Sequence, residues 1–84
     1  MQLRTADVSW RDVDNDVVLL DERTWKYVHL NAAASVLWRA LVEGPQSETD
    51  LESRLVDEFD IDSDRARDDV SDFVAQLRSR EYVE

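Results

Sequence analysis

The spacing of apolar residues along this chain changes near Asn31. Before Asn31, apolar side chains alternate with polar ones or form short runs, a pattern that is typical of β-strands. After Asn31, apolar side chains recur every three or four residues, which is typical of amphipathic helices. The change of period predicts an α+β fold in which the strands come first and the helices follow.

The first two strands are expected to form a hairpin. Val8 and Trp10 alternate with polar neighbours, which predicts a strand with one buried face. Asp14 and Asn15 both tolerate left-handed backbone, so a tight turn is expected at these residues. Residues 17–20 (Val-Val-Leu-Leu) are apolar at every position, as in a central strand.

A second turn over residues 21–24 leads to a third strand, which is expected over residues 25–30. One face of this strand carries Trp25, Tyr27 and His29, and the other carries Lys26, Val28 and Leu30. The three strands are expected to form an antiparallel meander, with the first and third strands at its edges.

Three helices are expected after the strands. Asn31 is a good N-cap for a helix over residues 32–42, and Gly44-Pro45 terminates it. Ser47 or Thr49 can cap the second helix, because an acid follows each of them three residues later, as in a capping box. The apolar stripe of this helix comprises Leu51, Leu55, Val56 and Phe59.

Asp62 or Ser63 begins the third helix, whose apolar stripe comprises Ala66, Val70, Phe73, Val74 and Leu77. A short turn over residues 60–62 joins the second and third helices. This order of elements predicts a winged helix-turn-helix with an N-terminal three-stranded antiparallel sheet followed by three helices. Because 84 residues have room for one core, residues 1–84 are expected to form a single domain.

Charge and composition argue against nucleic-acid and membrane partners. The net charge is −10, and eight acids but only two arginines lie between residues 57 and 72. Nucleic-acid binding needs a basic surface, so we expect no nucleic-acid partner. The chain has no cysteine, no apolar signal segment and no apolar run long enough to span a membrane. We therefore expect a cytoplasmic protein with no membrane partner.

No combination of residues predicts catalysis. His29 is the only histidine, and the sequence supplies no suitably spaced partner for a catalytic or metal site. Asp60, Asp62 and Asp64 resemble the start of a calcium loop, but the central glycine is missing and Ser71 occupies the position of the bidentate glutamate. We expect a binding domain rather than an enzyme, with no metal and no cofactor.

The third strand is the most informative feature of the sequence. An edge strand that is rich in aromatic residues and lacks proline exposes backbone groups that recruit other strands. One interpretation is that its apolar side chains belong to the core, while Lys26 and His29 protect the edge. The other interpretation is that an extended peptide adds to the edge as a further strand. Physical reasoning from the residues favours neither.

An ordered set of residues carries a family resemblance. The set comprises Leu20, Asp21, Thr24, Tyr27, Leu30 and Asn31, then Trp38, Leu41, Glu43 and Gly44, and finally Asp69, Val70, Phe73, Val74 and Leu77. Together these residues resemble the PqqD-like family, the precursor-peptide recognition elements of ribosomal peptide biosynthesis, over about residues 8–83. The small size and the Tyr27-x-x-Leu30-Asn31 segment look most like the free-standing leader-binding proteins of lasso-peptide pathways.

The resemblance implies a function and partners. A leader peptide is expected to add as an antiparallel strand on the third strand, in the cleft with the third helix. The partner enzyme is expected to be a separate leader peptidase, a transglutaminase-like cysteine protease. Two alternatives are a peptide chaperone for another modifying enzyme, such as a radical SAM enzyme, and a winged-helix protein–protein adaptor. The protein itself is expected to be a monomer or a weak dimer.

The resemblance also places peptide-binding residues on the third strand and third helix. These residues are Trp25, Lys26, Tyr27, Val28, His29, Leu30, Asp69, Val70, Phe73, Gln76 and Leu77. If the Lys26 face of the strand is turned towards the third helix, Val28 and Leu30 line the pocket. Otherwise, the opposite face lines it, with Trp25, Tyr27 and His29.

The third helix has two flanks beside its apolar stripe. One flank carries Asp69, Gln76 and Arg80, and the other carries Arg67, Ser71 and Arg78. We expect the first flank to line the cleft, because Phe73 lies at its edge and can serve both the core and the cleft. The turn before the third strand departs from the family, which commonly has glycine where this chain has Trp25. If that position needs a positive φ, tryptophan is strained there.

Overall fold

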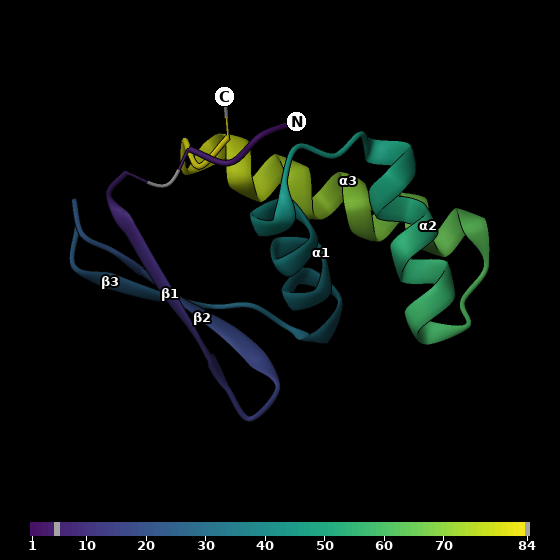
Figure 1. Ribbon diagram of the computed structural model, residues 1–84, viewed down its shortest axis with the longest axis horizontal. Coiled ribbons are helices and arrows are strands. Elements are labelled where there is room, and N and C mark those ends of the chain that lie inside the picture. The colour runs from purple at the N-terminus through teal and green to yellow at the C-terminus, as the bar shows by residue number, and fades with distance from the viewer. Residues whose placement is uncertain (5, 84) are drawn as a thin grey trace.

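The computed structural model describes residues 1–4 and 6–83. The strands are β1 (Val8–Val13), β2 (Asp16–Asp21) and β3 (Lys26–His29), and the helices are α1 (Ala32–Glu43), α2 (Glu48–Phe59) and α3 (Ser63–Ser79). The strands form an antiparallel sheet in the order β1-β2-β3. The expected α+β class and the order of strands and helices are confirmed. Figure 1 shows the sheet on one side of the molecule, α2 at the opposite side, and α1 between them.

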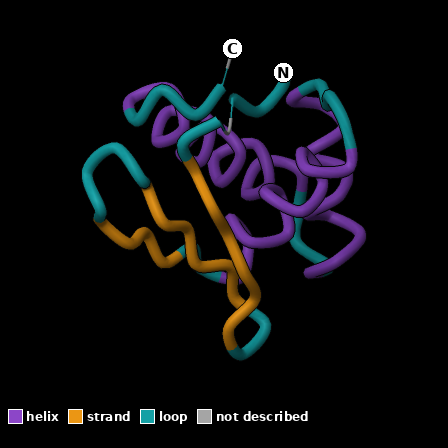
Figure 2. Tube along the Cα trace, turned by 60° about the vertical axis from the view of Figure 1, so that its left-hand side comes forward, coloured by secondary structure: helices purple, strands orange, loops and turns teal. Residues whose placement is uncertain are grey.

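The tight turns have the backbone that their residues favour. Asp14 and Asn15, which join β1 to β2, have φ values of 53° and 72°, as the sequence predicted. Asp60 ends α2 with a φ of 51° and precedes the short turn into α3. Figure 2 shows that the helices pack on one side of the sheet.

Side-chain caps fix where the helices begin. Asn31 accepts a hydrogen bond from the backbone of the first turn of α1, as expected. Of the two residues considered for α2, Ser47 and not Thr49 is the cap, within a complete capping box. Of the two considered for α3, Asp62 and not Ser63 is the cap. Each such cap stabilises its helix by roughly 1 kcal/mol.

The core lies between the inner face of the sheet and the three helices. Its fully buried side chains include Val17 and Leu19 of β2, Leu37 and Trp38 of α1, and Leu51 and Leu55 of α2. The apolar stripe of α3 is buried as predicted, with Ala66, Val70, Phe73, Val74 and Leu77 no more than 2% exposed. Each large apolar side chain buried in this way contributes about 1.5–3 kcal/mol.

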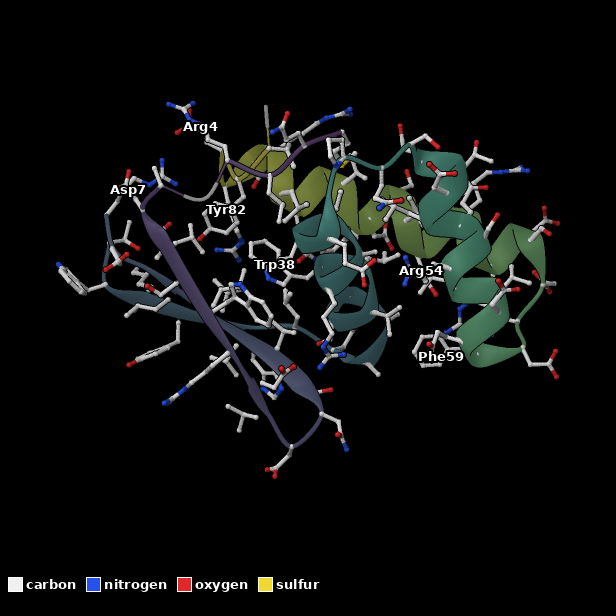
Figure 3. All side chains as sticks on the ribbon, viewed as in Figure 1. Arg4, Asp7, Trp38, Arg54, Phe59 and Tyr82 are labelled. Atoms are coloured by element: carbon white, nitrogen blue, oxygen red, sulfur yellow. The ribbon has the colours of Figure 1, made fainter. Side chains whose placement is uncertain are left out.

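Some expectations about burial are wrong. In β1, Val8 is buried, but Trp10, which lines a pocket with Leu41 and Val42 of α1 on an edge strand of the sheet, is 37% exposed. Phe59, which was expected on the buried stripe of α2, is 39% exposed at the C-terminal end of that helix (Figure 3). The strand expected over residues 25–30 is shorter at both ends, since Trp25 lies in the turn and Leu30 follows the strand.

Ser35 joins α1 to the sheet from inside the core. Its side chain is fully buried, and its Oγ accepts a hydrogen bond from the backbone N–H of Val17 at 2.8 Å. The same hydroxyl donates to the carbonyl oxygen of Leu30 at 3.2 Å. One side chain thus satisfies backbone groups of β2 and of the segment that leaves β3, so it helps to hold β3 in place.

We expect Ser35→Ala to lower the free energy of unfolding by about 1–3 kcal/mol, because the N–H of Val17 loses its partner inside the core. In a domain of this size, 1 kcal/mol corresponds to about 4–8 °C in Tm, so the change is measurable by thermal melting. Ser71→Ala, on the exposed face of α3, is the matched control and should stay within about 0.5 kcal/mol of wild type. Equal stability of the two variants would show that the buried hydroxyl contributes nothing.

Among the described residues, no helix is long and apolar enough to cross a bilayer.

Candidate functional site

The outer edge of β3 carries backbone groups that no described strand occupies. The N–H of Leu30 donates to the carbonyl oxygen of Val17 on β2 at 2.9 Å. Because backbone groups of successive residues in a strand point to opposite edges, those of Val28 and Lys26 also point towards β2. The N–H and C=O groups of Tyr27 and His29 therefore point away from the sheet. This edge can accept one further strand.

The two faces of β3 have different surroundings. Val28 pairs with Leu19 of β2, whose side chain is fully buried, so Val28 and Lys26 lie on the inner face of the sheet. Tyr27 pairs with Leu20 on the outer face and is 67% exposed. Of the two arrangements left open by the sequence, the structure has the Lys26 face turned towards the helices.

A groove of about 470 Å³ lies between this inner face of β3 and the end of α3. We call it the β3–α3 groove; it is lined by Asp21, Arg23, Thr24, Lys26, Val28, Ser79, Arg80, Glu81 and Tyr82. It opens directly beside the unpaired edge of β3. A chain that pairs with this edge can therefore place alternate side chains in the groove.

A buried network forms the floor of the β3–α3 groove. Tyr82 is fully buried, and Figure 3 shows it beside the end of α3. Its hydroxyl donates a hydrogen bond to Oδ2 of Asp21 at 2.8 Å. Arg23 contacts Oδ1 of Asp21 at 3.4 Å and Glu81 at 3.3 Å, and it donates to the carbonyl oxygen of Arg80 at 2.7 Å. The network thus ties the turn before β3 to the residues that follow α3.

The network shifts the pKa values of its members. The hydrogen bond from Tyr82 is the largest reason why the pKa of Asp21 lies below its ordinary value, and Arg23 acts in the same direction. Burial raises the pKa of Tyr82, and the hydrogen bond to Asp21 raises it further, so the phenol stays protonated and remains a donor.

The lowered pKa of Asp21 predicts a pH dependence of stability. The folded state favours the ionised carboxylate of Asp21, so this group adds to the free energy of unfolding in full above its ordinary pKa, near pH 4. That stabilisation is lost as the pH falls from there through the lowered pKa of the folded state. We expect Asp21→Asn to lower Tm at pH 7, and the difference from wild type to shrink below about pH 4. Asp72→Asn, on the exposed face of α3, is the control; an identical pH profile for both variants would contradict the assignment.

The two flanks of α3 face different neighbours. On the second flank, Arg67 approaches Glu52 of α2 at 4.0 Å, and a pocket between α2 and α3 includes Arg67 and Ser63. On the first flank, Arg80 lines the β3–α3 groove, and Asp69 pairs with Arg65 at 3.5 Å within the helix. The first flank lies on the side of α3 that is turned away from α2.

Trp25 lies in the turn before β3, and the other residues that the resemblance placed at the site fall into four groups. Lys26 and Val28 line the β3–α3 groove, while Tyr27 and His29 supply the free edge, and the His29 ring lies 2.9 Å from Asp16. Asp69 is half-buried and Gln76 is exposed on the first flank of α3. The remaining apolar members belong to the core and are at most 4% exposed: Leu30, Val70, Phe73 and Leu77.

Several groove residues were not predicted as site residues from the sequence. Tyr82 lies after the last helix, outside any apolar stripe, yet it is fully buried. Asp21 and Arg23 were predicted in the turn before the third strand, and Asp21 also belongs to the set that carries the family resemblance, but neither was predicted to line a groove. Their association with Tyr82 joins residues 61 positions apart, and no local pattern indicates it.

Trp25, which stands where the family commonly has glycine, occupies a left-handed turn position, so the condition stated for strain is met. Its φ is 58°, a conformation that costs a residue other than glycine about 1–2 kcal/mol. Its side chain is 70% exposed, so little burial offsets this cost. Strain of this kind is common where a side chain contacts a ligand.

Two solved structures are similar over nearly the whole chain. One is TbiB1 in complex with the TbiA(beta) leader peptide, with a TM-score of 0.85 and 28% identity over 100% of this chain and 95% of that one. The other is lasso peptide synthetase B1 complexed with the leader peptide, with a TM-score of 0.81 and 28% identity over 99% of this chain and 95% of that one. A comparison with curated proteins gives no match. The family model of coenzyme PQQ synthesis protein D matches residues 16–83, most of the chain, so this protein belongs to the PqqD family.

Proposed function

We propose that this protein is a non-catalytic recognition element that binds the leader segment of a ribosomally synthesised precursor peptide. The observation that carries the proposal is the unpaired edge of β3 beside the β3–α3 groove. Two leader-peptide complexes with the same fold at 28% identity support it.

The leader binds by strand addition, antiparallel to β3. Its backbone pairs with the outward N–H and C=O groups of Tyr27 and His29, and alternate side chains enter the β3–α3 groove near Val28. The first flank of α3, with Asp69 and Gln76, forms the opposite wall. One strand with two or three side chains in pockets provides about 8–10 kcal/mol, or a Kd of roughly 1 μM to 50 nM.

The proposed partner enzyme is a separate leader peptidase of a lasso-peptide pathway. Similarity to a lasso peptide synthetase B1 supports this choice. The direct test is to measure the rate at which that peptidase cleaves the precursor with and without this protein. Equal rates would remove the delivery role but leave leader binding intact.

The test of leader binding uses calorimetry and amide chemical shifts with the leader of the cognate precursor. We expect 1:1 binding, with the largest shift changes at Tyr27 and His29. Among variants that keep the wild-type Tm, Asp69→Ala/Gln76→Ala should weaken binding, and Arg67→Ala/Ser71→Ala should not, because Arg67 faces α2. The reverse result would place the peptide on the other flank, and no heat or shift change at micromolar concentration would refute the function.

Trp25→Gly should separate stability from binding. Glycine relieves the left-handed strain but gains backbone freedom in the unfolded chain, so the free energy of unfolding should rise by up to about 1 kcal/mol. Leader affinity should fall a few-fold, because the exposed indole adjoins the proposed binding edge. Thermal melting and calorimetry measure the two effects. A loss of stability would mean that the indole packs against the fold, and unchanged affinity would mean that it does not touch the leader.

A further inference from the structure

The charge of the β3–α3 groove differs from that of the whole protein. The chain has a net charge of −10, yet three bases and two acids line this groove. Both acids are already engaged, since Asp21 and Glu81 each contact Arg23. The two remaining bases, Lys26 and Arg80, give the groove a local positive charge.

Lys26 and Arg80 have side chains without an ion pair or hydrogen bond among the described residues. They come from different elements, since Lys26 begins β3 and Arg80 follows the last residue of α3. The backbone of Arg80 is held in place, because its carbonyl oxygen accepts a hydrogen bond from Arg23. Most of the other arginines are paired with acids, namely Arg23, Arg39, Arg54, Arg65 and Arg67. Arg4, Arg11 and Arg78 also have no ion pair among the described residues, but they do not line the groove.

We propose that Lys26 and Arg80 form a carboxylate subsite, which binds an acidic side chain of the peptide that lies on β3. This inference rests on the proposed function, and it adds the chemistry of one ligand side chain. A carboxylate between the two cations forms charge-assisted hydrogen bonds that no described residue now supplies.

The register of β3 fixes where the acidic residue lies in the peptide. Val28 and Lys26 are two positions apart on one face of β3, and both line the groove, Val28 with an apolar side chain and Lys26 with a cationic one. In an antiparallel partner, the residue nearest Lys26 comes two positions after the residue nearest Val28. The recognised segment therefore has an apolar residue followed, two positions later, by Asp or Glu.

A phage-displayed library of random 12-residue peptides tests the subsite without knowledge of the natural leader. The protein is used as wild type, as Lys26→Glu/Arg80→Glu, as Lys26→Gln/Arg80→Gln, and as Arg11→Glu/Arg78→Glu. The last variant has the same change of net charge as the first, but its positions are exposed and lie outside the groove. Circular dichroism verifies that each variant is folded.

We expect wild type to select peptides with the apolar-x-acid spacing. Charge reversal at Lys26 and Arg80 should weaken these peptides about tenfold, and neutralisation should weaken them by a few-fold, because each exposed ion pair contributes modestly. Lysine in place of the peptide acid should restore affinity to the charge-reversed variant. The control Arg11→Glu/Arg78→Glu should bind within about twofold of wild type. Because salt screens ion pairs, 0.5 M salt should reduce the difference in affinity between wild type and Lys26→Glu/Arg80→Glu.

Two results overturn the subsite. If the selected peptides bind the β3 edge but show no enriched acid, the subsite is refuted and the proposed function remains intact. The same conclusion follows if the groove variants and the control variant lose equal affinity for the selected peptides. If no selected peptide perturbs the amides of Tyr27 and His29, strand addition itself fails, and the subsite fails with it.

Discussion

His29→Pro should weaken leader binding by about 10- to 100-fold while the domain stays folded. The N–H of His29 points to the free edge of β3 and has no partner in the sheet, so proline removes no existing ladder bond. An added strand, in contrast, loses one hydrogen bond of about 1 kcal/mol and meets the proline ring where its own backbone should approach. Calorimetry with the leader peptide measures the loss, and thermal melting measures the stability of the fold.

His29→Ala is the matched control for this experiment. It removes the imidazole and its contact with Asp16 but keeps the backbone N–H. We expect it to bind the leader within a few-fold of wild type. If alanine and proline weaken binding equally, the imidazole and not the backbone edge contacts the peptide, and strand addition on β3 is wrong.

Tyr82→Ala is expected to cause the largest loss of stability among the variants considered, about 3–5 kcal/mol of unfolding free energy. The ring is fully buried, and the backbone of Tyr82 bonds both to Leu77 at the end of α3 and to Arg4 of the N-terminal segment. A domain of 84 residues has only about 4–13 kcal/mol in total. Chemical denaturation should therefore show a variant that is close to unfolding at 37 °C.

Two further variants identify the cause of that loss. Tyr82→Phe keeps the ring in the core and removes only the hydroxyl that donates to Asp21, so it should lose much less stability. Phe59→Ala truncates an aromatic ring that is 39% exposed and should also lose less. If Tyr82→Ala is no worse than Phe59→Ala, Tyr82 does not anchor the end of α3 to the sheet.

The sequence by itself determined the features that depend on neighbouring residues. The left-handed turn at Asp14 and Asn15, the cap at Asn31 and the buried stripe of α3 all follow from local backbone preferences and from the helical period. For the other two helices, the sequence narrowed the cap to two candidates each, and the structure has Ser47 and Asp62. The family resemblance, which uses residues spread along the whole chain, also came from sequence and agrees with the match over residues 16–83.

The tertiary structure decided which side of β3 meets the helices. Both faces of residues 25–30 carry apolar side chains, so alternation alone could not choose between them. The choice depends on the pairing of Val28 with Leu19, because this register gives Lys26 and Val28 the inner face of the sheet. The same is true of the groove floor, where Asp21 meets Tyr82 across 61 positions of sequence. Contacts of this kind arise from the packing of whole elements, and short-range patterns carry no information about them.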